Sequence, residues 1–181
     1  MRYKVFRILA RGLSALGWNY KELISGYFRR HGMKVGSNCN VLSDINSSEP
    51  YLISIGDNVT ISNDVDFITH DASIGKVTNG ITSDLFGPIE IGNNCFIGAN
   101  SIIMYGVSLP DNTIVAAGSV VTHSVSPATG GGTIIGGSPA KVIGDWNEFR
   151  KKAKGRELSI KSMKADQRKN AVLDDKWWIY R

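Results

Sequence analysis

A six-residue repeat in the middle of the chain restricts its fold more than any other feature of the sequence. Written in sixes from Ile91, the chain reads IGNNCF, IGANSI, IMYGVS, LPDNTI, VAAGSV and VTHSVS. Every unit begins with a branched aliphatic residue, and its fifth residue is small or β-branched. A period of six matches neither the turn of a helix nor the alternation of a strand. The repeat therefore predicts short strands joined by tight turns, each strand pointing one aliphatic side chain inward.

Two shorter runs of the same repeat precede it. One begins at Ile55 with IGDNVT, and a weaker one begins at Val35. Gly-Asx sequences, such as those at 56–58 and 92–94, fall between the strands, and we expect them to supply the positive φ angles of the corners. Coils of this kind stabilise one another by stacking. We therefore predict an all-β solenoid over residues 35–144 with one continuous aliphatic core.

The segments on either side of the repeat have helical patterns. Apolar residues recur every three or four positions over residues 1–30, which predicts amphipathic helices broken near Gly17. A short helix is expected over 146–154, ended or bent by Gly155. The expected parts of the chain are an N-terminal helical segment (1–34), the solenoid (35–144) with a loop at 72–88, and a C-terminal helix and tail (145–181).

Charge and apolar residues are unevenly distributed along the chain. Residues 1–34 hold eight Lys or Arg against one acid, residues 35–144 hold two against nine, and residues 145–181 hold eleven against six. The two terminal segments are therefore basic. They could form solvated helical faces, or they could attract the protein to an anionic membrane surface or an anionic substrate. The middle has no basic stripe with aromatic residues, so nucleic acid binding is not expected. The apolar segment Trp177–Tyr180 is expected to be buried against another surface, either a neighbouring subunit or a membrane interface.

The sequence shows no targeting or membrane-spanning signal. Its first residues lack an apolar core of signal-peptide length. The sequence also contains no stretch of about 18 apolar residues, the length needed to cross a membrane. Cys39 and Cys95 are too few for a disulfide framework and are expected to stay free thiols. With 181 residues, of which 42% are hydrophobic, we expect one cytoplasmic domain, with the inner face of the membrane as the alternative location.

Three motifs follow one another in the repeat region: I-G-x-N-x-x-I-G-A-N-S-x-I from Ile91, V-A-A-G-S-V-V-T from Val115 and G-S-P-A-K-V-I from Gly137. In this order they resemble the hexapeptide-repeat acyltransferases, which include serine, galactoside, maltose and polysaccharide O-acetyltransferases. The resemblance covers roughly residues 35–144. It implies a left-handed parallel β-helix with three hexads per coil, a homotrimer, and acyl-CoA bound between neighbouring subunits.

His70 is the candidate general base. It lies in the last clear unit, FITHDA from Phe67, before the repeat disappears over 72–88. A long loop that leaves a regular fold is typical of a functional site. The resemblance implies a catalytic His at this kind of position, where it takes the proton of the acceptor hydroxyl. Its orienting or acceptor-binding partners would be Asp71 beside it, or Asp44 and Asn40 one to two coils earlier. The alternative is that these three residues only form turns.

The resemblance also implies how coenzyme A is held. A backbone N–H of the Gly98–Ala99 segment would stabilise the oxyanion. Small side chains at 116–119 would let the pantetheine arm approach the main chain, and Lys141 would meet a phosphate. Coil packing and a solvated end-cap are the alternative roles. The implied CoA-binding set is Gly98, Ala99, Ala117, Gly118, Thr122, His123 and Lys141. Ala99 stands where several relatives have Ser, and His123 where relatives commonly have Lys.

Other functions are weighed against this one. A metal enzyme like the γ-class carbonic anhydrases needs three His around one zinc ion, and His31, His70 and His123 include no close pair, so no metal is expected. A non-catalytic scaffold and another acyl donor, such as succinyl-CoA, stay open. We interpret the chain as an acetyl-CoA-dependent O-acetyltransferase for a sugar hydroxyl, of a surface polysaccharide or its precursor. Transfer to the nitrogen of an aminosugar, or to serine, is the alternative.

Overall fold

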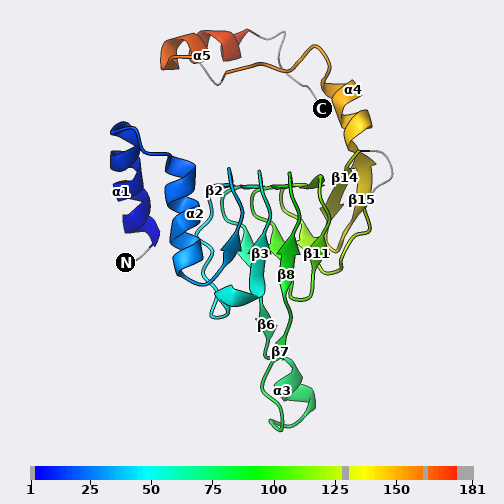
Figure 1. The fold of residues 1–181 in the computed structure, drawn as a ribbon. Coiled ribbons are helices and arrows are strands. Elements are labelled where there is room, and N and C mark those ends of the chain that lie inside the picture. The colour runs from blue at the N-terminus through cyan, green and yellow to red at the C-terminus, as the bar shows by residue number, and fades with distance from the viewer. Residues whose placement is uncertain (1–2, 128–130, 161–162, 175–181) are drawn as a thin grey trace.

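The computed structural model describes residues 3–127, 131–160 and 163–174. Two helices come first, α1 (Tyr3–Ala15) and α2 (Tyr20–Arg30) (Figure 1). Gly17, with a φ of 93°, lies between them. The side chain of Asn19 caps α2 by accepting a hydrogen bond from the backbone N–H of Glu22 at 3.3 Å, which satisfies one of the free donors of the first turn. The sequence predicted one or two helices here, and the structure has two, with the expected break near Gly17.

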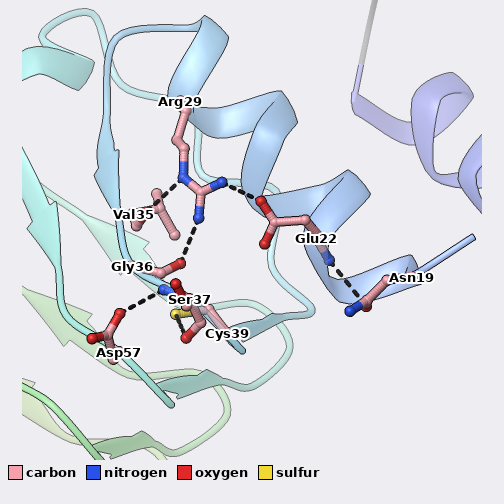
Figure 2. Close-up of polar contacts among 8 residues, drawn as sticks. All are labelled: Asn19, Glu22, Arg29, Val35, Gly36, Ser37, Cys39 and Asp57. Atoms are coloured by element: carbon pink, nitrogen blue, oxygen red, sulfur yellow. Dashed lines mark hydrogen bonds and ion pairs between the residues drawn. The ribbon is translucent and has the colours of Figure 1, made fainter.

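Arg29 ties α2 to the first strands (Figure 2). Its Nε donates to the carbonyl oxygen of Val35 at 2.6 Å, and its Nη2 donates to that of Gly36 at 2.7 Å. Its Nη1 forms an ion pair with Glu22 two turns earlier in the helix. These contacts hold α2 against the start of the strands, where Phe28 of the helix joins the buried core.

The chain then winds through three sheets of parallel strands, visiting them in turn (Figure 1). The first sheet contains β1 (Lys34–Val35), β3 (Ile53–Ile55), β8 (Ile89–Ile91) and β11 (Ser108–Leu109). The second contains β2 (Asn40–Val41), β4 (Thr60–Ile61), β9 (Phe96–Ile97), β12 (Thr113–Val115) and β14 (Thr133–Gly137). The third contains β5 (Asp66–Phe67), β10 (Ile102–Ile103) and β13 (Val120–Val121). One passage through the sheets is called a coil below.

The first positions of the repeat form the core. The strands pair in a register that stacks these positions on one another, as Ile55 on Ile91 and Ile91 on Leu109 in the first sheet. Each of the six first positions is at most 3% exposed: Ile91, Ile97, Ile103, Leu109, Val115 and Val121. Burial of this aliphatic column is the main stabilising term available to strands of two or three residues. The predicted inward column is confirmed.

Asn and Gly have different roles at the corners between strands. In the two Gly-Asx corners the positive φ belongs to the Asn, at Asn58 (56°) and Asn94 (56°), and in the corner Pro110–Asn112 it belongs to Asn112 (60°). Their amides also form a ladder, from Asn58 Nδ2 to Asn94 Oδ1 at 2.8 Å and from Asn94 Nδ2 to Asn112 Oδ1 at 2.7 Å. The glycine has another role, because a Cβ on Gly92 would lie 2.6 Å from the backbone N of Asp111 in the next coil. Close stacking of coils therefore requires the glycine.

A hairpin leaves the sheets where the repeat is interrupted. It consists of β6 (His70–Asp71) and β7 (Leu85–Phe86), which pair antiparallel, with α3 (Ile74–Val77) between them at its tip (Figure 1). The chain returns to the sheets at Gly87, where a Cβ would lie 2.5 Å from the backbone N of Gly106. His70 is thus the first residue of the projecting hairpin.

The C-terminal elements are β15 (Ala140–Asp145), which pairs antiparallel with β14, then α4 (Trp146–Ala153) and α5 (Ala165–Leu173). Asp145 caps α4, and Gly155, with a φ of 79°, follows its end, as expected for this short helix. Helix α5 lies in a stretch that the sequence presented only as a polar tail. The apolar end Trp177–Tyr180 lies outside the described residues. Over the described residues, no helix combines the length and apolar character needed to cross a membrane.

Candidate active site

The imidazole of His70 is paired with a carboxylate from the preceding coil. Its Nδ1 lies 2.9 Å from Oε2 of Glu49, which immediately precedes the 3₁₀ turn Pro50–Leu52. The Glu49 side chain is 13% exposed, whereas that of His70 is 41% exposed. The carboxylate is therefore the more buried partner of the pair, and the contact occupies Nδ1 and not Nε2 of the ring.

A second hydrogen bond fixes the carboxylate of Glu49. Thr69 Oγ1 donates to the same Oε2 at 2.6 Å, and Thr69 Oγ1 is also 2.9 Å from Ser47 Oγ. The backbone N–H of Glu49 donates to that Ser47 hydroxyl at 3.1 Å. The bond from Thr69, and after it the contact with His70, hold the pKa of Glu49 below its ordinary value in spite of partial burial.

An ionised Glu49 at Nδ1 determines what His70 can do. A carboxylate only accepts hydrogen bonds, so Nδ1 of the neutral ring carries the proton and Nε2 has its lone pair free. This is the tautomer that a general base needs, and the negative charge stabilises the imidazolium formed after proton uptake. The geometry can therefore support proton abstraction from a hydroxyl group.

Asp71 has different partners from His70. Its carboxylate accepts a hydrogen bond from the backbone N–H of Ser73 at 2.8 Å and one from the hydroxyl of Tyr105 at 3.4 Å. The Ser73 bond is the main reason why the pKa of Asp71 lies below its ordinary value. Asp71 thus links the hairpin to the next coil. Across the hairpin, the ring of Phe86 lies 5.8 Å from that of His70.

The orienting partner of His70 is therefore Glu49, and not one of the three residues expected from the sequence. Neighbouring residues of a strand point to opposite sides, which explains why Asp71 does not contact the ring. Asp44 lines a cavity beside α1 and α2, and Asn40 lies on β2 in register with Thr60. Counting hexads back from His70 fails because residues 42–52 do not follow the repeat. The SSEP sequence that ends this interruption, with its acid before a Pro, was the available signal for Glu49.

Part of the expected CoA-binding set is brought together at one corner, between the second and third sheets. A Cβ on Gly98 would overlap the backbone N of Ala117 in the next coil. The backbone N–H of Gly118 donates to the carbonyl oxygen of Ala99 at 2.8 Å. His70 lies at a different corner, between the third and first sheets. Within one chain, the residues of the Gly98–Gly118 corner are therefore not gathered around the His70 imidazole.

The remaining expected residues lie elsewhere. Thr122 and His123 follow β13 at the same corner as His70, two coils further on, and Thr122 Oγ1 is 2.8 Å from His123 Nδ1. Lys141 lies on β15, opposite Gly136, and is exposed.

The other His and Cys residues belong to the framework. His31 stacks on Tyr27 with ring centroids 4.1 Å apart, far from the hairpin in the chain. Cys39 and Cys95 are buried and free, and burial raises the pKa of both thiols, which makes them poor nucleophiles. Among the residues that the structure describes, no group of three or more His, Cys, Asp or Glu is placed to hold a metal ion.

Comparison with known proteins agrees with this architecture. A family model described as "Hexapeptide repeat of succinyl-transferase" matches residues 88–123. Protein CapG of Staphylococcus aureus is 41% identical over 127 residues, which cover 68% of this chain and 72% of CapG. Galactoside O-acetyltransferase of Escherichia coli (strain K12) is 30% identical over 130 residues, which cover 71% of this chain and 61% of that protein.

Solved structures show the same fold. The crystal structure of a maltose O-acetyltransferase from Clostridium difficile 630 superposes with a TM-score of 0.57 at 26% identity, covering 77% of this chain and 86% of that one. A galactoside acetyltransferase in complex with coenzyme A superposes with a TM-score of 0.53 at 24% identity, covering 72% and 73%. On the repeat, the three-sheet architecture and these relatives together, the chain belongs to the hexapeptide-repeat acyltransferase family.

Proposed function

We propose that this protein is an acetyl-CoA-dependent O-acetyltransferase that acetylates a sugar hydroxyl of a surface polysaccharide or its precursor. The observation that carries the proposal is the Glu49–His70 pair at the base of the projecting hairpin. Two relatives named as O-acetyltransferases of sugars, for galactosides and maltose, support the acceptor class and transfer to oxygen.

The chain's own residues supply the steps of the reaction. His70 Nε2 takes the proton of the acceptor hydroxyl as the oxygen attacks the thioester carbonyl. Glu49 holds the ring in place and stabilises the resulting imidazolium. A backbone N–H of the Gly98–Ala99 segment stabilises the oxyanion. When the C–S bond breaks, His70 returns its proton to the thiolate of CoA, so no covalent enzyme intermediate forms.

The site is assembled between copies of the chain. His70 and the Gly98–Ala117 pair lie at different corners of the stacked coils, so a neighbouring copy must bring one set to the other. A three-faced body suits a homotrimer with three equivalent sites, and we propose this assembly on a left-handed parallel β-helix. The helical segment 1–34, the β-helix 35–144 and the C-terminal segment 145–181 are its parts.

Coenzyme A lies along the corner with small side chains. Ala117 and Gly118 let the pantetheine arm approach backbone donors and acceptors, and Thr122 and His123, at the His70 corner of the neighbouring copy, contact it from the other side. Lys141, exposed on β15, meets a phosphate group. The matched relative with coenzyme A bound supports this ligand.

The hairpin 72–88 forms the acceptor side of the site. Phe86 lies beside the His70 ring and offers an apolar face on which a sugar ring can pack. Asp71 offers a carboxylate to acceptor hydroxyls, held in place by Ser73 and Tyr105. The two buried free cysteines fit a reducing compartment, the cytoplasm.

Acetyl transfer to a panel of acceptors tests the proposal. Release of the CoA thiol is measured with sugars, aminosugars and serine, and the product is analysed for ester or amide linkage. The proposal predicts release that depends on a sugar and yields an alkali-labile ester. An amide product would show that the acetyl group is transferred to nitrogen, which would contradict the proposed O-transfer. A folded protein that binds no CoA in equilibrium dialysis would contradict the transferase and favour a scaffold.

A further inference from the structure

Helix α1 carries a second apolar stripe that its packing does not use. The side that faces the fold is formed by Tyr3, Phe6 and Ala10, each at most 8% exposed. On another side of the helix, three large apolar residues are between 51% and 69% exposed, Val5, Ile8 and Leu9, and Leu16, just after the helix, is 78% exposed. Gly12 continues this stripe at an open position, since a Cβ there would meet no atom within 4 Å. The helix is therefore apolar on two sides.

Basic residues occupy the remaining side of α1. Lys4, Arg7 and Arg11 follow one another at helical spacing, and the segment Tyr3–Ala15 contains no acid. Arg7 also donates to the carbonyl oxygen of Leu42 at 3.0 Å, whereas Lys4 and Arg11 are exposed. A positive stripe thus runs beside the exposed apolar stripe.

The place of α1 in the fold leaves its outer side open. Figure 1 shows α2 between much of α1 and the strands. Trp18, just after the helix, is exposed beside Leu16 at the same end. An exposed Trp next to an amphipathic helix with basic residues is typical of a segment that lies in a membrane interface.

We propose that α1 docks this protein on the surface of an anionic lipid bilayer. The apolar stripe enters the boundary between headgroups and acyl chains, while Lys4 and Arg11 contact lipid phosphates. Lys4 and Arg11 complement the charge of lipid phosphates. Two copies that met through this face about a two-fold axis would instead place the same cations opposite one another.

The position of the stripe suits an acceptor carried by a lipid, a point that rests on the proposed function. A cavity of about 790 Å³ lies between α1, α2 and residues 44–50. Its lining runs from Lys4 and Val5 to Ser47, whose hydroxyl contacts Thr69 beside the Glu49–His70 pair. Docking through α1 brings the His70 end of the molecule to the surface where such an acceptor is anchored.

Vesicle flotation of the full-length protein tests the docking without any enzymatic reaction. The vesicles contain phosphatidylcholine alone or with about 30% phosphatidylglycerol, at about 0.05 M and 0.5 M salt. Wild type is expected to float with the anionic vesicles at low salt and much less at high salt or with the neutral lipid. Ile8→Ser/Leu9→Ser should weaken binding by about tenfold or more, and Lys4→Gln/Arg11→Gln by a similar factor at low salt.

Matched variants on other exposed surfaces are the controls. Val142→Ser/Leu173→Ser removes apolar residues that are 63% and 62% exposed, and Arg168→Gln/Lys169→Gln removes two charges from α5. Both should bind vesicles like wild type. Docking through α1 is overturned if wild type does not float, or if the α1 variants float as well as it does. If wild type does not float with vesicles and Ile8→Ser/Leu9→Ser lowers the oligomeric state in sedimentation, the apolar stripe of α1 contacts a second copy instead.

Discussion

Glu49 and His70 are 21 residues apart in the chain, yet Oε2 of Glu49 lies 2.9 Å from Nδ1 of His70. Stacking of successive coils brings them together, and Thr69, the residue before His70, donates to the same carboxylate oxygen. The contact occupies Nδ1 and not Nε2 of the ring. The proposed catalysis by His70 depends on this contact.

Replacing Glu49 by Gln should slow catalysis without weakening coenzyme A binding. The amide has nearly the same size but no charge to stabilise an imidazolium, and its NH₂ group can force the wrong tautomer of His70. We expect kcat to fall by about 10²-fold while the Kd for CoA changes by less than about twofold. Steady-state kinetics and equilibrium dialysis measure the two quantities. The exposed Glu157→Gln is the matched control, and an equal loss there, or a selective rise in the Kd for Glu49→Gln, would contradict the role.

The same carboxylate predicts how stability depends on pH. Because the folded-state pKa of Glu49 lies below its ordinary value of 4.5, its contribution is fully present above pH 4.5. It is lost as the pH falls through the lower, folded-state pKa. The stability difference between wild type and Glu49→Gln should therefore shrink as the pH falls below 4.5. Urea unfolding at a series of pH values below 4.5 checks this, and a difference that grows over that range would contradict the sign.

Gly98→Ala should destabilise the stacked coils. Its Cβ would overlap the backbone N of Ala117, and backbone cannot move aside as a side-chain tip can. We expect a loss of about 1–3 kcal/mol. Gly12→Ala is the matched control, because the same methyl group there meets open space within a helix and should stabilise by about 0.5–1 kcal/mol. Denaturant unfolding at one fixed protein concentration compares them; equal effects would refute the close approach at Gly98.

Asn58 offers a test of the corner geometry. Both Asn58→Ala and Asn58→Gly remove its amide from the ladder with Asn94, but only Gly accommodates a φ of 56° without strain. Asn58→Ala should therefore cost about 1–2 kcal/mol more than Asn58→Gly. Unfolding of the two variants measures the difference directly, and equal stabilities would mean that the positive φ is not under strain.

The sequence was most informative where the repeat is regular. A branched aliphatic residue at every sixth position predicted the buried column from Ile91 to Val121, because each strand of the stack buries one such side chain. The interruption after His70 identified the corner from which a hairpin projects. Both signals are local in the chain.

The features that the sequence did not reveal depend on contacts between distant or irregular segments. Glu49 lies in a stretch without the repeat, so its depth in the stack could not be counted from His70. The antiparallel return of β15 along β14 follows from a turn and not from a hexad. The positions of His70 and of the Gly98–Ala117 pair at different corners depend on how the irregular segments join the coils, which the repeat itself does not specify.

The most direct test of the account compares His70→Ala with wild type in acceptor-dependent release of CoA. Glu157→Gln, on the exposed C-terminal segment, is the control. We predict that His70→Ala loses about 10²-fold or more in kcat while binding CoA like wild type, and that Glu157→Gln stays within about threefold of wild type. Wild-type turnover by His70→Ala would show that another group removes the proton and would contradict the central claim.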